Sequence, residues 1–386
     1  MRVRLICALL VLAGFSGCGN QPAATSTSTP TPAPAPAAVT HTYNGTASVG
    51  DFLTITLNST ALTISYKDLT NGLSGTIPYT VNANGSYTLN DPAGHLISAY
   101  EVPGYALVIQ ANNVGPNSDT AALITAVESG PISLSNFSGN SYNYIQFRTQ
   151  FGGLEVGTVS ISGSTGTNSS YWPYGYFNQG SGGAFNASTM DFSGLTEDAS
   201  GTFVSGTIPG SGGGTDTIFG TASGFFIVDS PSGSIIGLPK AATSAFDPTV
   251  AGTYNGVFYE KANVTMGNGT NVETGTPSTG QATIVITAAV GATLPNITVT
   301  DPNGNTIINA ALTPVANSSF LYGNGNDGKL TDPCNGLFAF RAVTGTYEHD
   351  VFVTFVGNSV VFSKFSATLP WSQSSGYSYW YGVGLK

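Results

Sequence analysis

The chain has 386 residues, of which only 8% are charged, and its 20 acidic and 10 basic side chains give a formal net charge of −10. Because soluble proteins usually carry about 25% charged residues, hydroxyl, amide and glycine groups must keep this surface wet. No stretch of the mature sequence is rich in lysine or arginine, and nucleic-acid-binding proteins need a basic surface. The composition therefore argues against a nucleic-acid partner.

Residues 1–17 have the pattern of an export signal. Two arginines precede an apolar run over residues 5–15, and this run is too short to span a bilayer as a mature helix. Ser16-Gly17-Cys18 follows. This pattern resembles the signal peptide of bacterial lipoproteins, although Phe15 stands where that family usually has leucine. The resemblance implies that residues 1–17 are removed and that Cys18 becomes the lipidated N-terminus.

The residue after the lipidated cysteine bears on the destination of a lipoprotein. Here it is Gly19, whereas an aspartate at this place would argue for retention at the inner membrane. The resemblance thus implies a cell-envelope protein held by a lipid anchor, at the outer membrane or the cell surface. Two or three acyl chains would make that anchor durable, since each buried methylene contributes about 0.8 kcal/mol.

Residues 18–39 are expected to be the lipidated cysteine and a disordered linker. Residues 21–39 consist mostly of proline, threonine and alanine, without a charge. Such a tract has no side chains to bury in a core, and its alternating prolines favour an extended polyproline II conformation. At about 3.1 Å per residue, it would hold the folded region several nanometres from the bilayer.

From residue 40 onward the sequence has the alternation of β-strands. Short segments rich in valine, isoleucine, threonine and aromatic residues are bounded by Asn-Gly, Asp-Pro or glycine-rich turns, and none of comparable length has a helical period. Examples are DFLTITL, YALVIQA, ATIVITA, VFVTFVG and VVFSKFS. The pattern predicts an all-β fold of tandem antiparallel meander domains, each a small barrel or sandwich.

A weak internal repeat suggests how these strands are grouped. Thr42-Tyr43-Asn44-Gly45 recurs as Thr253-Tyr254-Asn255-Gly256, and Ser141-Tyr142-Asn143-Tyr144 is a degenerate third copy. Spacings of about 100 residues are typical of tandem domains rather than of a solenoid. We expect three β-domains, over residues 40–135, 140–245 and 250–386. A two-domain split near residue 250 is the alternative.

Each unit resembles, in size and number of strands, the small up-and-down barrels of the lipocalin and streptavidin type. Those barrels open with a Gly-x-aromatic strand, which Gly252-Thr253-Tyr254 matches and His41-Thr42-Tyr43 does not, because it lacks the glycine. The resemblance implies an architecture only, since one fold supports many functions.

The sequence offers little for catalysis or metal binding. Of three histidines, only His349 has carboxylate neighbours, Glu348 and Asp350, and along a strand it would face away from both. Asp191, Glu197 and Asp198 could supply the two carboxylates of a glycosidase. Because twenty acidic residues place some pair close together by chance, we expect no catalytic residue, no metal and no cofactor.

Two further motifs have ordinary interpretations. Residues 323–328 match G-x-G-x-x-G, but no helix pattern follows, so a hairpin turn is expected rather than a dinucleotide site. The side-chain oxygens of Asn324, Asn326, Asp327 and Asp332 could instead bind calcium, although these residues do not have the spacing of an EF-hand. Cys334 has no histidine beside it in the sequence, and we expect an unreactive buried or loop thiol.

Aromatic residues form the one unusual cluster. Tyr171, Trp172, Tyr174 and Tyr176 belong to a segment with five aromatics in seven residues, between glycine- and serine-rich flanks. Tyrosine and tryptophan combine apolar area with a hydrogen-bonding tip, which suits contact with a glycan or a protein. Filling of a barrel interior is the alternative. A second cluster comprises Trp371 and residues 377–381, whose alternating tyrosines look like an ordinary last strand.

Together these features predict a lipid-anchored cell-envelope protein that displays β-domains for binding, without catalysis. Its expected partners are the membrane, through the anchor, and a glycan or another envelope protein. Two alternatives stay open. One is a secreted glycan-acting hydrolase that uses the carboxylates named above, and the other is a purely structural coat protein.

Overall fold

The computed structural model describes residues 39–91, 94–114, 120–148, 153–171, 185–209, 213–221, 224–231, 233–264, 275–288, 294–315, 332, 334–368 and 377–386. Within these ranges the chain is nearly all β, as the alternating pattern predicted. Helical structure there is limited to α1 (Leu134–Phe137) and η1 (Pro248–Val250). No helix in these ranges is long and apolar enough to cross a membrane.

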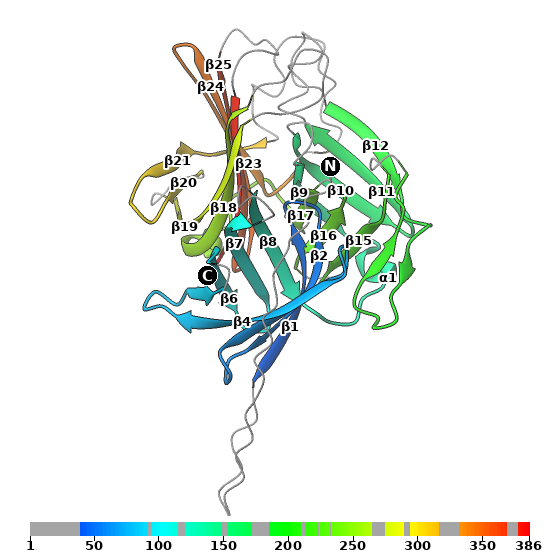
Figure 1. Ribbon diagram of the computed structural model, residues 1–386. Helices are drawn as coiled ribbons and strands as arrows, with labels where there is room; N and C mark the ends of the chain where they lie inside the picture. Colours follow the sequence, from blue (N-terminus) through cyan, green and yellow to red (C-terminus); the bar gives the residue numbers. More distant parts are fainter. Residues whose placement is uncertain are drawn as a thin grey trace, which may run out of the picture.

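The first unit is a closed barrel of eight antiparallel strands (Figure 1), which we call the first barrel. Each strand pairs with the next along the chain, and β8 pairs back with β1. The strands are β1 (Thr40–Ala47), β2 (Phe52–Asn58), β3 (Thr63–Asp68), β4 (Leu73–Val81), β5 (Tyr87–Asn90), β6 (Leu96–Val102), β7 (Ala106–Val114) and β8 (Thr120–Glu128).

The second sheet has nine strands in the order β12-β11-β10-β9-β17-β16-β15-β14-β13. β9 and β17, the first and last strands of this unit in the sequence, pair in the middle of the sheet. Its two edges, β12 and β13, are consecutive in sequence, so the sheet must curl until they approach each other. The strands are β9 (Ser141–Arg148), β10 (Gly153–Ser162), β11 (Thr165–Tyr171), β12 (Phe185–Asp191), β13 (Thr196–Glu197), β14 (Val204–Gly206), β15 (Asp216–Gly220), β16 (Phe226–Ser230) and β17 (Gly233–Pro239).

The third sheet repeats this plan in the order β21-β20-β19-β18-β26-β25-β24-β23-β22. Its edges β21 and β22 are separated by Leu312 alone, so this sheet also curls almost into a barrel. The strands are β18 (Gly252–Val264), β19 (Thr276–Ala288), β20 (Pro295–Thr300), β21 (Thr306–Ala311), β22 (Thr313–Pro314), β23 (Leu337–Thr344), β24 (Tyr347–Val356), β25 (Ser359–Thr368) and β26 (Tyr377–Leu385).

The sequence repeat lies on the first strand of each unit. Its tyrosines, Tyr43, Tyr142 and Tyr254, are all fully buried, each inside its own barrel or sheet. The next residue faces outward because strand side chains alternate. Accordingly Asn44 donates to the carbonyl oxygen of Thr202 in the second unit at 2.9 Å, and Asn143 donates to that of Asn335 in the third at 2.7 Å.

Predicted Asn-Gly turns occur where the sequence placed them. Gly72, Gly85 and Gly304 follow asparagines, and each has a positive φ between 71° and 83°. A backbone with positive φ is costly for residues with a Cβ, so glycine fixes the turns that join these strands.

The outer faces of the three units share one apolar core. It combines side chains of the first barrel, such as Phe52 and Leu123, with Phe147 of the second sheet and Tyr259 and Tyr379 of the third. Strands that meet there are buried on both faces, which explains unbroken apolar runs such as VFVTFV in β24. The strands of the units lie within residues 40–128, 141–239 and 252–385. Whether each unit folds alone stays a prediction.

Phe147 is central to the contact between the second and third sheets. Its ring centroid lies 4.7 Å from that of Tyr259, 5.7 Å from that of Tyr379 and 5.5 Å from that of Tyr381, the last in a stacked arrangement. Tyr379 and Tyr381 therefore belong to an ordinary last strand, β26, whose alternate residues face the shared core.

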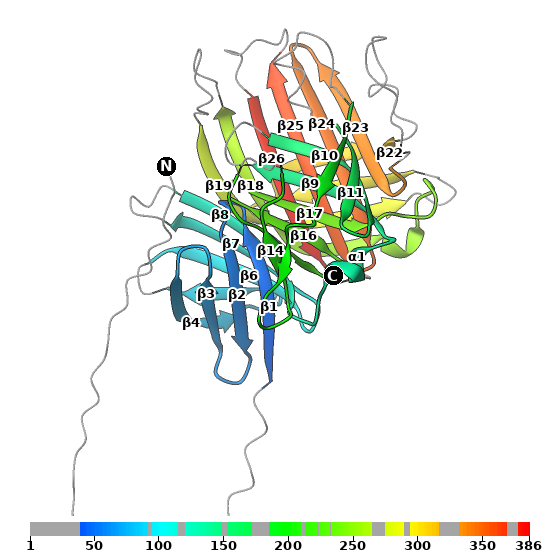
Figure 2. The same ribbon diagram turned by 90° about the vertical axis from the view of Figure 1, so that its right-hand side faces the viewer.

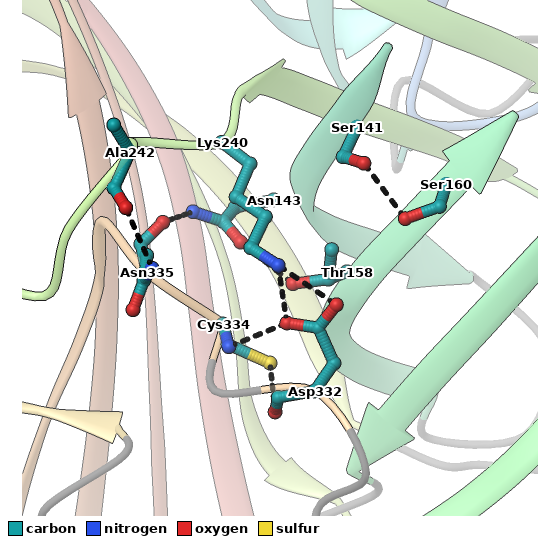
Figure 3. Close-up of polar contacts among 9 residues, drawn as sticks. All are labelled: Ser141, Asn143, Thr158, Ser160, Lys240, Ala242, Asp332, Cys334 and Asn335. Atoms are coloured by element: carbon teal, nitrogen blue, oxygen red, sulfur yellow. Dashed lines mark hydrogen bonds and ion pairs between the residues drawn. The ribbon is translucent and has the colours of Figure 1, made fainter. Parts of the chain in front are cut away.

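A polar junction beside this aromatic contact joins the same two sheets (Figure 3). The Lys240 ammonium lies 2.6 and 2.8 Å from the carboxylate oxygens of Asp332, and the same carboxylate accepts the backbone N–H of Cys334 at 2.8 Å. Cys334 is buried, and burial raises the pKa of its thiol to about 11. The expectation of an unreactive buried thiol agrees with this environment.

Two other junctions hold the first barrel. Thr279 of the third sheet exchanges hydrogen bonds with Asn112, because its N–H donates to Oδ1 at 2.8 Å while its carbonyl accepts from Nδ2 at 2.6 Å. Toward the second sheet, Thr46 donates to the buried carboxylate of Asp229 at 2.5 Å. A Cβ on Gly50 would lie 2.6 Å from the carbonyl oxygen of Pro231, so this turn approaches the second sheet closely.

Candidate functional site

The inner face of the third sheet changes from apolar to polar along its strands. Its apolar part includes Tyr254, Phe258 and Phe362 and draws on nearly every strand of the sheet. Farther along the same strands and on the same face lie five polar or amphipathic residues, which we call the third-sheet cluster: Glu260 on β18, His349 on β24, Lys364 and Ser366 on β25, and Trp380 on β26.

The strand register explains why these residues meet. Trp380 lies directly opposite both Glu260 and Lys364, and Ser366 lies opposite His349. All five are half-buried, unlike the closed apolar part below them. Partly buried titratable groups on the concave face of a sheet are a common feature of binding and catalytic sites.

Trp380 separates two opposite charges. Its indole N–H donates to Glu260, and the Lys364 ammonium lies 4.5 Å from its ring centroid. Lys364 also donates to the carbonyl oxygen of Ile307 at 2.7 Å. Burial raises the pKa of Glu260 and lowers the pKa of Lys364, while the attraction between the two charges opposes both shifts.

His349 and Ser366 form the second half of the cluster. The Ser366 hydroxyl lies 2.8 Å from Nδ1 of His349, at hydrogen-bond distance. Burial, and next the positive charge of Lys364, lower the pKa of His349 from 6.5, so the imidazole is neutral near pH 7. Neither neighbouring carboxylate orients this pair, because Glu348 and Asp350 face the opposite side of β24, where Arg341 contacts both.

The sequence analysis expected this alternation of residues 348–350, and the structure has it. On the outer face, burial, and next the charge of Glu348, raise the pKa of Asp350 to about 7, while Arg341 opposes the shift. These carboxylates therefore form an ion-pair group on the outer face and do not activate His349.

The other two units also have a glutamate on the inner face, and each of these glutamates accepts a hydrogen bond from at least one tyrosine. Glu101 in the first barrel accepts from the hydroxyl groups of Tyr43 at 2.5 Å and Tyr87 at 2.7 Å. Glu155 in the second sheet accepts from Tyr144 at 2.6 Å. Burial raises the pKa of all three tyrosines, so they stay protonated donors. Among the described residues, the third sheet is the unit that adds both a lysine and a histidine to its glutamate.

The residues predicted to bind lie largely outside the described ranges. Cys18, Trp172, Tyr174 and Tyr176 fall there, and the backbone of Tyr171 ends β11, opposite Phe185 of β12. Trp371 and the G-x-G-x-x-G motif also fall outside the described ranges.

The predicted glycosidase carboxylates hold turns. Asp191 accepts the N–H of Ser193 at 2.9 Å, and Asp198 accepts the N–H groups of Ser200, Thr202 and Phe203 at 2.7 to 3.1 Å. Donors of this kind lower the pKa of both carboxylates, and Glu197 is exposed. A glycosidase acid needs a raised pKa, so this arrangement does not favour the alternative.

Sequence reasoning did not single out Glu260 or Lys364, and it named Trp380 only as a member of the second aromatic cluster. The sequence did contain one signal, the lysine in VVFSKFS. Lys364 is two residues from Phe362, so both lie on the same face of the strand, and Phe362 lies on the inner face. The partners of this lysine could not be identified, since they come from strands about 100 residues away in the sequence and from the last strand.

Neither a protein-family model nor a curated protein matches the chain. Among solved structures, a DUF3598-family protein of unknown function from Nostoc punctiforme is 11% identical, with a TM-score of 0.24, over 67% of this chain and all of that one. Transferrin binding protein B from Haemophilus parasuis is 8% identical, with a TM-score of 0.20, over 90% and 76%. Kievitone hydratase from Nectria haematococca is 6% identical, with a TM-score of 0.18, over 89% and 88%. Likeness at this level says nothing about function.

Proposed function

We propose that this chain is a lipid-anchored, non-catalytic binding protein of the cell envelope. In this proposal Cys18 is the anchor, the Pro-rich tract is a spacer, and the three-unit body presents a binding end to its surroundings. The observation that carries the proposal is the half-exposed third-sheet cluster, where charged and aromatic side chains line the inner face of a curled sheet.

The position of this cluster supports display away from the membrane. β1, the first strand of the described chain, begins at the lower end of the molecule in Figure 2, and β24 to β26 extend to the upper end. The cluster lies toward the start of β26, because Trp380 is near the first residue of that strand.

Anchoring is tested by Cys18→Ser in the full chain. The substitution is expected to move the protein from the membrane fraction to the soluble fraction, and mass spectrometry of the unmodified protein is expected to find acyl chains on Cys18. An N-terminus that begins elsewhere, without acyl groups, contradicts the anchor.

Binding is tested with the soluble Cys18→Ser protein on panels of envelope glycans and envelope proteins. Replacing Trp172 and Tyr174 together by alanine is expected to weaken binding by more than about 2 kcal/mol, if they are central contacts, with an unchanged melting temperature. Val81→Ala is the control, since Val81 is an exposed residue of the first barrel, away from both candidate contacts. A large fall in melting temperature would instead assign the pair to the core.

A further inference from the structure

Two basic side chains of the third-sheet cluster have donors left over. Among the described residues Lys364 makes one hydrogen bond, to Ile307, and its ammonium packs on Trp380. The only hydrogen bond of His349 within the described residues is the one at Nδ1, so its other ring nitrogen has no partner among them. Both side chains face the interior and are half-exposed.

The same two groups are close enough to interact electrostatically. Lys364 lies opposite Val351, two residues beyond His349 on the same face of β24. Diagonal neighbours of this kind are within reach of a long side chain. The positive charge of Lys364 accordingly disfavours a second positive charge on His349.

The other charges near this point are accounted for. Glu260 is the acidic residue among the described inner-face partners, and it is bound by Trp380. Glu348, Asp350 and Arg341 lie on the outer face of the sheet and pair with one another. An incoming negative group would thus meet Lys364 and His349, with Glu260 held away by the indole.

We propose that the third-sheet cluster binds an oxyanion of its ligand, a carboxylate or a phosphate, between the Lys364 ammonium and the His349 imidazole. This proposal rests on the proposed binding function and names the chemistry that the site recognises. Charge-assisted hydrogen bonds to such oxygens are the strong ones in proteins, and Ser366 orients the imidazole from its other side.

A consequence is that binding takes up a proton. The bound anion offsets the repulsion from Lys364, so it favours the imidazolium form, which can donate from its second nitrogen. Binding therefore raises the pKa of His349, and the dissociation constant of the anion falls as the pH is lowered from about 7 to about 5.5.

The test is a histidine-selective NMR titration of the full-length Cys18→Ser protein. The chain has only three histidines, and His349→Gln assigns the relevant signal. The probes are inorganic phosphate, acetate and uncharged glucose, each titrated at pH 5.5 and 7.5. We expect phosphate, acetate or both to shift the His349 signal, with tighter binding at pH 5.5, and glucose to leave it unchanged. Comparison of the two dissociation constants shows whether the site prefers phosphate or a carboxylate.

Variants separate the site from general charge. Lys364→Met is expected to weaken anion binding at least about tenfold, since it removes a charged hydrogen-bond donor. Lys67→Met removes an exposed lysine of the first barrel and should have no effect. If Lys364→Met does not fold, Ser366→Ala with the same titration takes its place, and it is expected to lower affinity and weaken the dependence on pH.

No shift of His349 with either anion, or equal losses in Lys364→Met and Lys67→Met, overturns the inference. Failure of this site leaves the proposed binding function testable, because the glycan and protein panels include uncharged ligands. If the panels find no partner while anions bind with the expected variant and pH effects, only the broader proposal fails.

Discussion

At the scale of single residues, glutamates on the inner faces of the sheets accept hydrogen bonds from aromatic side chains. Each unit surrounds an inner glutamate with a tyrosine hydroxyl or an indole N–H, as at Glu101, Glu155 and Glu260. A buried charge without such donors would be costly. In the third sheet the glutamate faces a lysine across the same indole, so removing either charge leaves the other without this counterpart.

This arrangement predicts coupling between Glu260 and Lys364. Glu260→Gln and Lys364→Met are each expected to lower stability, and the double variant should lose less than the sum of the two. The coupling should be about 1 kcal/mol, at the low end of the usual range, because both side chains are half-exposed and water screens them. Thermal unfolding of the four proteins measures it, with Glu260→Gln and Lys67→Met as an additive control pair. Strict additivity for Lys364 would contradict the pairing.

A second prediction concerns the acidic contact between the first barrel and the second sheet. Asp51 is buried, and one of its carboxylate oxygens has no hydrogen-bond partner in the part of the chain that the structure describes. Burial, with the charge of Asp68, raises the pKa of Asp51 from 3.8 to about 6. The neighbouring Asp229 is also buried, and burial raises its pKa well above 3.8. The folded state therefore holds these protons more tightly than the unfolded state.

The sign of the pH effect follows from this difference. A raised carboxyl pKa contributes stability that is present at low pH and is lost as the pH rises from about 4 to above 6. Asp51 alone accounts for up to about 3 kcal/mol of that loss. Asp51→Asn should remove this part of the pH dependence in urea unfolding between pH 4.5 and 7.5. Asp191→Asn, at an exposed turn carboxylate, should not. An unchanged pH profile in Asp51→Asn would contradict the assignment.

At the scale of elements, the three first strands show how one motif is adapted. Gly45 and Gly256 occupy the fourth position of the repeat, whereas the second unit has Tyr144 there. The partners of Tyr144 on both neighbouring strands are glycines, Gly157 and Gly237. Tyr144 is fully buried, and its hydroxyl group reaches Glu155.

The glycines of the other two copies are expected to differ in importance. A Cβ at Gly256 would lie 2.3 Å from the backbone oxygen of Val383, which the paired strand holds in place. At Gly45 the nearest atom would be the Cβ of Ala126, at 3.0 Å. Gly256→Ala should therefore cost about 1 to 3 kcal/mol, as overpacking does, and Gly45→Ala less. Midpoints of thermal unfolding compare the two. Equal losses would mean that β26 can shift to make room.

At the scale of the whole molecule, the units are joined through the outer faces of their strands. The shared core contains side chains from all three units, and Phe147 packs on three tyrosines of the third. Because of this shared core, the three units pack against one another and are not independent domains joined only by linkers.

The repeat predicts that residues 250–386 fold alone, and the shared core adds a condition to this prediction. The separated unit should unfold cooperatively, yet at a lower temperature than the full chain, since it exposes Tyr259, Tyr379 and Tyr381. Calorimetry and binding of a hydrophobic dye test both points. A fragment that is soluble only when joined to the preceding units would show that the outer-face contacts are required for folding.

The sequence by itself determined the elements. Alternating apolar residues predicted the strands, Asn-Gly pairs predicted turns that have positive φ, and the repeated tyrosine identified the first strand of each unit, because these features depend on neighbours in the chain. Which strands became buried on both faces, and that Glu260, Trp380, Lys364 and His349 meet, were decided only by the tertiary structure. Those outcomes depend on strand register and on the packing of one sheet against another, which join residues about 100 positions apart and leave no local pattern.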